Sequence, residues 1–280
     1  MKIAVLSGKG GTGKTTIAVS LALSLPGSQL IDCDVEEPNV HLFLKPEIKE
    51  EKVVNTLVPE VDYEKCNFCG YCAKICAYNA LSVLKFGEKE GEILLFNHLC
   101  HGCGGCILLC PEKAMKEATR PVGVLRIGEG KGIKFVEGRL NISEVLAPLV
   151  IEEAKKLAQE DGVVILDAPP GTSCPAVATL KETDFALLVT EPTPFGLHDL
   201  ELAYEVTKAL KVPAGVVINK AGEDDIVEEF CSSRNLSILL KIPFKREIAS
   251  AYAQGIPLVE AIPDYKVKFQ ELYNQIRGML

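Results

Sequence analysis

The stretch Gly8–Thr15, which reads GKGGTGKT, constrains the fold of this chain more than any other feature. It fits the pattern G-x-x-x-x-G-K-[ST], in which glycine backbone N–H groups converge on phosphate oxygens at the start of a helix. The apolar run Ile3–Leu6 before it predicts a strand, and a helix is predicted after it over 14–25. Strand, glycine-rich loop and helix in this order predict a nucleotide-binding α/β domain, with an ordinary glycine-rich turn as the alternative.

Two side chains of this loop and one distant aspartate have predicted tasks at a bound nucleotide. We expect the ammonium of Lys14 along the β- and γ-phosphates and the hydroxyl of Thr15 on Mg²⁺. Asp167 ends the apolar run VVILD and is placed to hold the same Mg²⁺ through water. The predicted nucleotide-binding residues of the loop are Gly8, Gly10, Gly11, Thr12, Gly13, Lys14, Thr15 and Thr16.

Strand-like and helix-like segments alternate along most of the chain. The strand-like runs are short, β-branched and almost wholly apolar, as expected for strands buried on both faces of a parallel sheet. We therefore predict an α/β fold with a doubly wound, mostly parallel sheet. Further strands are predicted at 29–34, 162–171, 184–192, 214–222 and 236–243. Helices are predicted at 144–159, 197–210, 225–234 and 248–254.

Eight of the 11 cysteines lie in a block that interrupts this alternation. They form two runs of one spacing, C-x₂-C-x₂-C-x₃-C, which start at Cys66 and Cys100. In a reducing compartment such a block indicates metal rather than disulfides, and zinc usually takes two pairs of ligands rather than two triplets. The spacing resembles that of bacterial two-cluster ferredoxins, in which the fourth cysteine of each run ligates the other cluster.

This resemblance implies two [4Fe–4S] clusters in a small α+β domain inserted at 58–117. The P-loop ATPase domain would then comprise 1–57 and 118–280. The implied ligand sets are Cys66, Cys69, Cys72 and Cys110 for one cluster, and Cys100, Cys103, Cys106 and Cys76 for the other.

The residues KGGTGKT resemble the deviant P-loop of the MinD/ParA/Mrp superfamily of ATPases, which includes the nitrogenase iron protein. The resemblance implies that Lys9 reaches across a nucleotide-bound dimer to the partner's phosphates, where it would neutralise charge as an arginine finger does. It implies that Asp34 positions or activates the attacking water and that Asp32 supports the Mg²⁺ shell. Asn219, in VINKAG, would hydrogen-bond the adenine, and Pro243 would border it in a loop that matches the family less well.

Taken with the cysteine runs, the chain resembles MinD-superfamily ATPases that carry an inserted ferredoxin domain. The implied partners are a second copy of the chain or a paralogue, joined when ATP and Mg²⁺ are bound, and a client redox or metalloprotein. The favoured function couples this dimer cycle to electron transfer through the clusters. Two alternatives stay open: a carrier that assembles iron–sulfur clusters or another metallocofactor, and a redox-sensing positioning ATPase of the ParA or MinD kind.

The three remaining cysteines are treated separately. Cys174 follows Asp167 by the same offset as a cluster-ligating cysteine in the nitrogenase iron protein, so it is a candidate interface thiol. The alternative is a small residue packed at a helix start. Cys33 and Cys231 are expected in the core.

Composition excludes some function classes. The net charge of −8 and pI of about 5.2 argue against partners such as nucleic acid or an acidic membrane surface. The N-terminal residues form no signal peptide, and no apolar run is long enough for a membrane span, so a cytoplasmic location is expected. The apolar stripe in 265–280 predicts a helix packed on the sheet rather than a membrane anchor.

Overall fold

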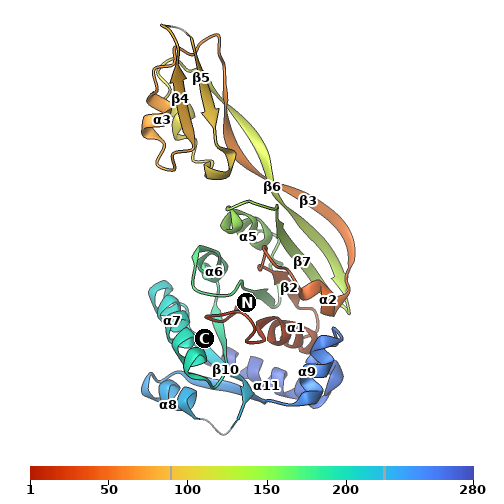
Figure 1. Cartoon of the computed structure of the whole chain (residues 1–280). Helices are drawn as coiled ribbons and strands as arrows, with labels where there is room; N and C mark the ends of the chain where they lie inside the picture. The colour runs from red at the N-terminus through yellow and green to blue at the C-terminus, as the bar shows by residue number, and fades with distance from the viewer. Residues whose placement is uncertain (89, 223–224) are drawn as a thin grey trace. The chain divides into compact units, whose positions relative to one another are not determined.

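The computed structural model describes residues 1–88, 90–222 and 225–280, and these fold as two compact units. The sheet unit comprises Met1–Lys52, Leu125–Arg139 and Ala147–Leu280, and the cysteine unit comprises Val53–Val124 and Leu140–Leu146 (Figure 1). The insert predicted at 58–117 falls within the cysteine unit, whose boundaries are wider at both ends. No helix of the described residues is long and apolar enough to cross a membrane.

A nine-stranded sheet runs through the described part of the chain in the order β11-β10-β9-β1-β8-β2-β7-β6-β3. Every strand pair from β11 to β7 is parallel, which confirms the α/β class and the mostly parallel sheet. Its strands are β1 (Lys2–Leu6), β2 (Gln29–Asp32), β3 (Glu47–Val61), β6 (Met115–Gly130), β7 (Ile133–Leu140), β8 (Val164–Asp167), β9 (Phe185–Thr190), β10 (Ala214–Ala221) and β11 (Ser237–Pro243).

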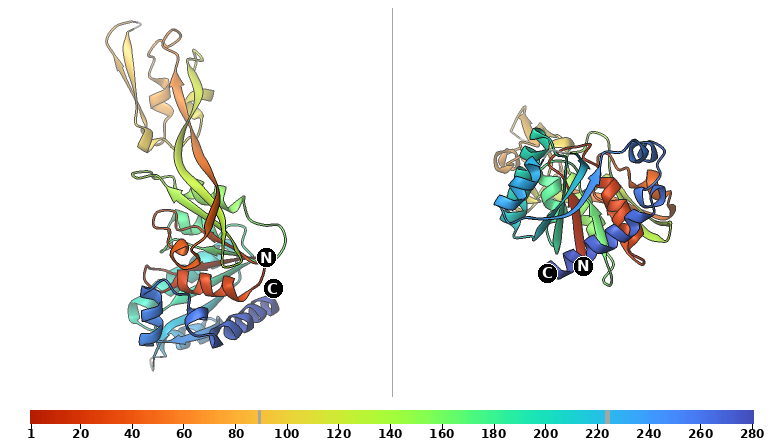
Figure 2. Two further views of the ribbon diagram at one scale, coloured as in Figure 1. Left: turned by 90° about the vertical axis from the view of Figure 1, so that its right-hand side faces the viewer. Right: turned by 90° about the horizontal axis from the view of Figure 1, so that it is seen from below.

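The central strands are nearly continuous apolar runs because helices cover both faces of the sheet. Every residue of β2, β8 and β9 is buried, as are the last four of β1. On one face α1 contacts α2, α10 and α11, whereas on the other α5, α6, α7 and α8 contact one another in sequence (Figure 2). The helices are α1 (Lys14–Ser24), α2 (Val40–Leu44), α5 (Ala147–Lys155), α6 (Cys174–Leu180), α7 (Pro194–Leu210), α8 (Ile226–Ser233), α9 (Arg246–Ala253), α10 (Leu258–Ala261) and α11 (Asp264–Met279).

The C-terminal stripe is part of the main hydrophobic core. Phe269, Leu272 and Ile276 of α11 are fully buried and Tyr265 is nearly so. The helix packs chiefly along α1, with smaller contacts to β11 and α10, so it covers the sheet as expected but mainly through another helix.

At the far edge of the sheet β7, β6 and β3 lie in this order, a pairing that the sequence did not predict. β6 and β7 are joined only by Lys131 and Gly132, both at positive φ, which makes them an antiparallel hairpin. A Cβ at Gly128 would lie 2.1 Å from the carbonyl oxygen of Glu47, so the start of β3 runs beside the end of β6. The polar residues 45–54 carried no strand signal because the first half of β3 is an edge with most side chains exposed.

The cysteine unit is built from two similar halves on a small core. Each half has a short helix preceded by a glycine at positive φ, Gly70 (77°) before α3 and Gly104 (71°) before α4. The buried core residues are Phe68, Cys72, Leu81, Ile93 and Met115. The elements are α3 (Tyr71–Ile75), α4 (Gly105–Leu108), the 3₁₀ turn Asn97–Leu99, and the antiparallel strands β4 (Leu81–Lys85) and β5 (Gly91–Leu95).

The segment Leu140–Leu146 belongs to the cysteine unit although it lies far along the chain. Arg120 donates to the carboxylate of Glu144 and, at 2.8 Å, to the carbonyl of Asn97. The backbone N–H of Asn141 donates to the carbonyl of Val122 at 2.9 Å. These contacts join side chains that are far apart in the sequence and that no local pattern pairs. For this reason the sequence-based prediction assigned the segment to the ATPase domain instead.

Candidate functional site

The glycine-rich loop joins β1 to α1 and is held by close backbone approaches. Gly13 has a φ of 93° and precedes α1 with no side-chain cap, so the first N–H groups of the helix are open to a ligand. A Cβ at Gly13 would lie 2.4 Å from Nδ2 of Asn219, and a Cβ at Gly8 would lie 2.2 Å from the carbonyl oxygen of Asp199 on α7. Larger residues at either position would therefore displace the loop.

Two consecutive residues near the end of β10 hold two consecutive carbonyls of this loop. Nδ2 of Asn219 donates to the carbonyl of Thr12 at 2.7 Å, and Nζ of Lys220 donates to the carbonyl of Gly11 at 3.2 Å. Lys220 is itself paired with Glu191 at 2.7 Å. Because these carbonyls already have donors, the loop keeps one orientation and leaves its N–H groups for the ligand.

Three buried carboxylates lie side by side on neighbouring strands. Asp167 of β8 is in register with Asp32 of β2, and Asp32 is in register with Glu137 of β7. All three are fully buried. Paired residues of parallel strands project to the same face, so the sheet itself assembles this row of acids.

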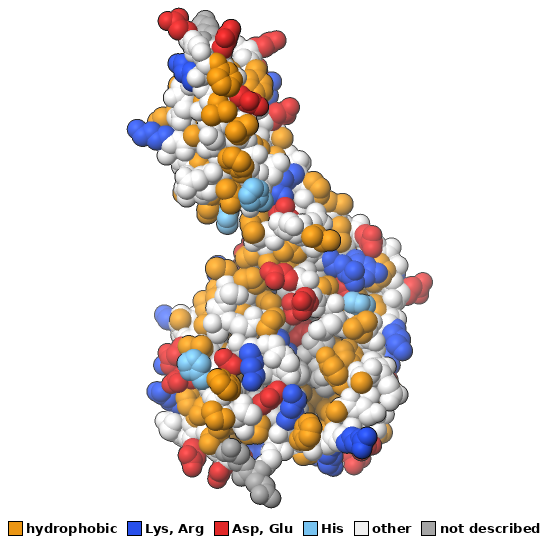
Figure 3. All heavy atoms as spheres, viewed as in Figure 1, with side chains coloured by type: hydrophobic (Ala, Val, Ile, Leu, Met, Phe, Trp, Pro, Cys, Tyr) orange, Lys and Arg blue, Asp and Glu red, His pale blue; other side chains and the backbone are white. Residues whose placement is uncertain are grey.

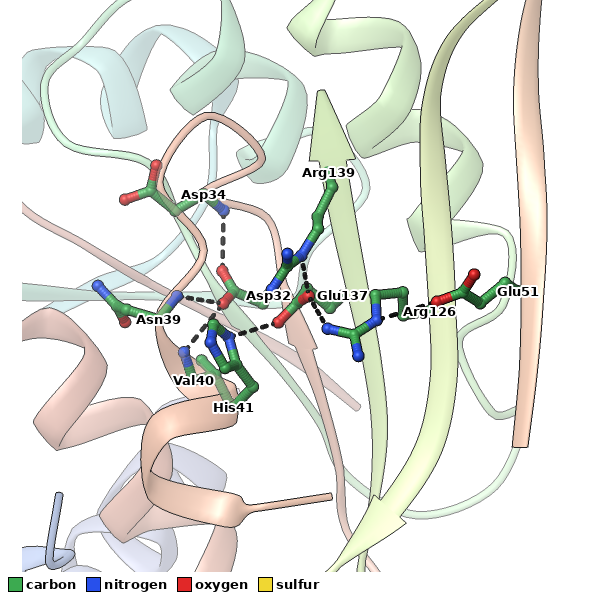
Figure 4. Close-up of polar contacts among 9 residues, drawn as sticks. All are labelled: Asp32, Asp34, Asn39, Val40, His41, Glu51, Arg126, Glu137 and Arg139. Carbon is green, nitrogen blue, oxygen red and sulfur yellow. Dashed lines mark hydrogen bonds and ion pairs between the residues drawn. The ribbon is translucent and has the colours of Figure 1, made fainter. Parts of the chain in front are cut away.

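Asp32, in the middle of the row, organises a backbone loop. Its Oδ1 accepts from the N–H of Asp34 at 3.1 Å, and its Oδ2 accepts from the N–H groups of Asn39 at 3.0 Å and Val40 at 3.1 Å (Figure 4). Burial, and next the nearby charge of Asp167, raise the pKa of Asp32 well above its ordinary range. The carboxylate of Asp32 thus accepts hydrogen bonds from three backbone N–H groups, and its place in a Mg²⁺ shell stays a prediction.

Asp167 has the opposite surroundings. Within the described residues neither of its carboxylate oxygens has a hydrogen-bond partner of ordinary geometry. Burial raises the pKa of Asp167 to about 7, while the Thr15 hydroxyl and the Lys14 ammonium act to lower it. An unpartnered buried carboxylate beside a threonine hydroxyl and a lysine is a donor set that suits a hard divalent cation with phosphate ligands.

Asp34 stands closer to solvent, at the end of the loop that Asp32 holds. It is partly exposed and lines the pocket. Burial raises the pKa of Asp34 to about 6, and the positive charge of Lys14 opposes the rise. A carboxylate with such a pKa is suited to orient a water molecule and accept its proton.

These segments enclose a pocket of about 370 Å³ at the carboxyl ends of the parallel strands. Figure 3 shows charged side chains of both signs mixed on the face in view, with no broad area of one sign. The predicted residues that line the pocket are Gly10, Gly11, Gly13, Lys14, Thr15, Thr16, Asp34, Asn219 and Pro243.

Five predicted residues do not line the pocket. Asp32 and Asp167 are fully buried, Thr12 is buried within the loop, and Gly8 packs on α7. Lys9 is partly exposed, and its carbonyl accepts from the hydroxyl of Ser7. Lys9 is not among the residues that line the pocket of its own chain.

Sequence reasoning missed one wall of the pocket. Glu37 and Asn39 follow Asp34 by three and five residues, so their closeness to a predicted site residue could have indicated them. The apolar wall comes from α9, which carries no motif, and from the end of β11 with the loop after it, where only Pro243 was predicted as a site residue. The further lining residues are Pro170, Lys220, Phe244, Lys245, Ile248, Ala249, Tyr252 and Leu258.

The cysteine unit has two hollows, each lined by four cysteines. The first is lined by one predicted set, Cys66, Cys69, Cys72 and Cys110. The second is lined by the other, Cys76, Cys100, Cys103 and Cys106. In each hollow the cysteine that comes from the opposite run accepts a backbone N–H at 3.3 Å, from Ala114 to Sγ of Cys110 and from Ala80 to Sγ of Cys76.

The thiols of each hollow interact electrostatically. Burial raises the pKa of Cys72, and the neighbouring Cys66, Cys69 and Cys110 add to the rise. Burial likewise raises the pKa of Cys106 to about 11, with the largest charge contribution from Cys100. A bound cationic centre would lower the pKa of these thiols again, because it stabilises the thiolate form that ligates metal. No three Cys, His, Asp or Glu side chains in the described ranges converge closely enough to hold a single metal ion.

The other three cysteines differ in exposure. Cys174 is exposed at the first position of α6, after Ser173. Cys33 and Cys231 are buried in the core, as the sequence predicts.

Comparison with known proteins identifies relatives over the whole chain. A family model described as the CobQ/CobB/MinD/ParA nucleotide binding domain matches residues 3–258. An uncharacterized protein of Methanocaldococcus jannaschii is 31% identical over 290 residues, which covers 100% of this chain and 98% of that protein. An iron-sulfur cluster carrier protein of Pyrococcus horikoshii is 26% identical over 306 residues, covering 100% of this chain and 86% of the carrier.

Solved structures share the fold at lower identity. The cell division ATPase MinD of Pyrococcus furiosus has a TM-score of 0.60 and 21% identity, with 100% of this chain and 99% of that chain covered. The septum site-determining protein MinD of Pyrococcus horikoshii, complexed with Mg-ADP, has a TM-score of 0.61 and 20% identity, with 98% and 95% covered. At these identities the likeness shows the fold alone.

Proposed function

We propose, from the premise that this chain belongs to the CobQ/CobB/MinD/ParA nucleotide-binding family, that it is an ATPase whose nucleotide cycle controls two [4Fe–4S] clusters. One observation carries the proposal: a pocket lined by a phosphate-binding loop and two four-cysteine hollows occur in a single chain. The clusters would serve electron transfer to a client redox or metalloprotein.

The residues present fit a Mg²⁺-bound nucleotide. The Thr15 hydroxyl and the unpartnered Asp167 carboxylate would hold Mg²⁺, which would neutralise phosphate charge in the transition state. Lys14 and the N–H groups at the start of α1 would bind the phosphates. Asp34 would orient the attacking water and take its proton, and Asp32 would hold Asp34 in place through the loop backbone.

Adenine is the base that the pocket favours. Nδ2 of Asn219 donates one of its two hydrogens to the Thr12 carbonyl, and Oδ1 is the acceptor that this side chain would offer to a base. Oδ1 accepts a hydrogen bond from the 6-amino group of adenine, whereas guanine presents an acceptor at that position. The rings of Phe244 and Tyr252, which line the same pocket, would cover the base.

The cysteine hollows fit two [4Fe–4S] clusters, which would supply one-electron transfer. Each hollow provides the four thiolates that such a cluster needs, and the two N–H groups on Cys76 and Cys110 are of the kind that tunes cluster potential. Eight thiolates supplied by one chain favour retained clusters over donated ones.

A nucleotide-dependent dimer completes the proposed cycle. Lys9 does not line the pocket of its own chain, which agrees with the proposed role of its ammonium at a partner's phosphates. The partner would be a second copy or a paralogue. Cys174, exposed at the start of α6, would then face the partner as a candidate interface thiol.

A cluster carrier is the second candidate function, favoured by the carrier protein of Pyrococcus horikoshii at 26% identity. The two functions differ in what happens to iron. A carrier incubated with an apo-client would lose iron to it, whereas an electron donor would reduce a client and keep its iron.

The reduction potentials of both clusters, measured anaerobically with and without a non-hydrolysable ATP analogue, test the first proposal. We expect a nucleotide-dependent shift in the wild-type protein that is absent in Lys9→Ala. A protein that neither hydrolyses ATP nor holds iron would refute the proposal. Equal potentials in all samples would refute nucleotide control of the clusters.

A further inference from the structure

We propose that Glu137 is a positioning residue that joins the loop 33–40 of the nucleotide pocket to strands β6 and β3. Through it, the state of the pocket reaches two strands that continue into the cysteine unit. The four side chains that carry this connection are called the relay: His41, Glu137, Arg126 and Glu51 (Figure 4).

The relay starts at the loop that faces the nucleotide. Asp32 holds both ends of this loop, through the N–H of Asp34 on one side and the N–H groups of Asn39 and Val40 on the other. Asp34 and Asn39 line the pocket. His41 follows directly on α2, so a ligand that moves this loop also moves His41.

Glu137 lies at the centre of the relay. It is fully buried on β7, in register with Asp32. Its Oε1 accepts from Nη1 of Arg126 at 3.1 Å and from Nε of Arg139. Its Oε2 lies 2.8 Å from Nδ1 of His41. One carboxylate thus joins three elements that carry cationic or titratable side chains, namely α2, β6 and β7 itself.

The relay ends on the edge strands. Nε of Arg126 on β6 donates to Oε1 of Glu51 on β3 at 3.2 Å. β3 continues to Val61, shortly before Cys66, and β6 begins at Met115, shortly after Cys110. Both cysteines line the first hollow. The two strands are therefore covalent continuations of the segments that carry its ligands.

The link between His41 and Glu137 is the one that can change. The two atoms are close, but in this conformation they are not aligned as a hydrogen bond. The His41 side chain keeps 28% of its exposure, whereas Glu137 is buried and held by two arginines. A shift of the loop 33–40 would align or break this contact while the remaining contacts of Glu137 persist.

Stability does not explain a buried cluster of this kind. Burying several charges has a desolvation cost, and apolar residues of similar volume often stabilise a fold as well. Apolar packing is not directional, however, and would respond weakly to a small movement of the loop. A network of directional charge-assisted bonds has discrete arrangements, which is the property that coupling between two sites requires.

This inference rests on nucleotide binding in the proposed function, and its test separates the two. The experiment measures amide hydrogen exchange of β3 and β6 in the cluster-loaded protein, under anaerobic conditions, with and without a non-hydrolysable ATP analogue. Binding of the analogue is measured on the same samples by calorimetry. In the wild-type protein we expect exchange of these strands to slow by about threefold or more.

Three variants cut the relay at different points. Glu137→Gln removes the central charge at nearly constant volume. We expect kcat for ATP to fall about tenfold with KM within about twofold, and the slowing of exchange to be lost. His41→Leu should also lower kcat and reduce the slowing of exchange. His41→Asn restores a donor near the position of Nδ1, so it should regain most of the wild-type kcat and exchange response. Glu51→Gln should keep kcat and lose the response of β3.

The matched control is Glu129→Gln. Glu129 pairs with Lys49 at 3.1 Å across the same two strands, but both side chains are about half exposed and neither contacts the relay. This variant should keep kcat and the full exchange response. If Glu137→Gln fails to fold, the variants at His41, whose side chain is partly exposed, provide the test.

Two results would overturn the inference while leaving the proposed function intact. One is a wild-type protein that binds the analogue with no change of exchange in β3 and β6. The other is a wild-type response retained in both Glu137→Gln and His41→Leu. A wild-type protein that does not bind the analogue would refute the proposed function, and the relay with it.

Discussion

The nucleotide pocket and the cysteine hollows are built in opposite ways. The pocket collects side chains from segments spread from Gly10 to Leu258, positioned by a sheet with a large apolar core. The hollows take their cysteines from two short runs over a core of few residues, and several of these cysteines are partly exposed. Small domains with small cores commonly depend on a bound metal centre. The comparison predicts that the chain itself holds the pocket, whereas the clusters hold the cysteine unit.

Removal of iron should have the largest effect and tests this contrast directly. Chelation under reducing conditions should abolish slow hydrogen exchange in the described parts of 58–117, because thiolate ligation contributes folding free energy to small metal domains. ATP binding and the exchange of β1, β8 and β9 should stay within about twofold of the loaded protein. A cysteine unit that remains protected without iron would contradict the comparison.

Lys14→Ala should have the next largest effect, confined to the pocket. Loss of the ammonium that is proposed to bind the phosphates should lower kcat for ATP by at least about 100-fold. Iron content and the spectrum of the clusters should not change. The control is Lys131→Ala, which removes a lysine paired with Glu260 outside the pocket and should keep full activity. Loss of iron in Lys14→Ala would show that the two regions are not independently built.

Asn219→Ala sharpens the description of the pocket. It removes both the donor to the Thr12 carbonyl and the acceptor proposed for adenine. We expect kcat/KM for ATP to fall about tenfold while that for GTP changes little, so that the preference for ATP narrows. Lys220→Met is the control, because Lys220 holds the neighbouring Gly11 carbonyl and should affect both nucleotides alike. Equal losses for ATP and GTP in Asn219→Ala would contradict direct contact with the base.

Cys174→Ser should have the smallest effect on iron. Cys174 lines neither hollow, so iron content measured by elemental analysis should stay at the wild-type level. Cys72→Ser removes a proposed cluster ligand of the first hollow and should lower iron by about half. If Cys174 faces a dimer partner, its serine variant should alter the ATPase rate or dimer formation. Unchanged rate, dimerisation and cluster transfer would end that hypothesis.

The sequence predicted those parts of the site that are encoded locally. The phosphate loop is one short stretch between a strand and a helix. Asp167 ends the apolar strand β8, and Asp34 follows two residues after the end of β2. The four-cysteine groups follow from spacing and the ferredoxin resemblance, and the structure gathers the same residues around two hollows. In each case residue type and spacing carry the chemistry.

Other features had no local signal. The start of β3 looks polar because it is an edge strand, and the segment 140–146 joins the cysteine unit through Arg120 and Glu144. The apolar wall of α9 has an ordinary amphipathic pattern, so its place beside the nucleotide pocket could not be foreseen.

By itself, the sequence determined the class of fold, the phosphate loop and the cysteine spacing, because these depend on backbone periodicity and on the chemistry of single residue types. Only the tertiary structure decided that Glu137 lies beside Asp32, and that its carboxylate joins His41 to Arg126 and Glu51. Strand register sets which side chains become neighbours. Register follows from the packing of the whole sheet, and so no short stretch of sequence contains it.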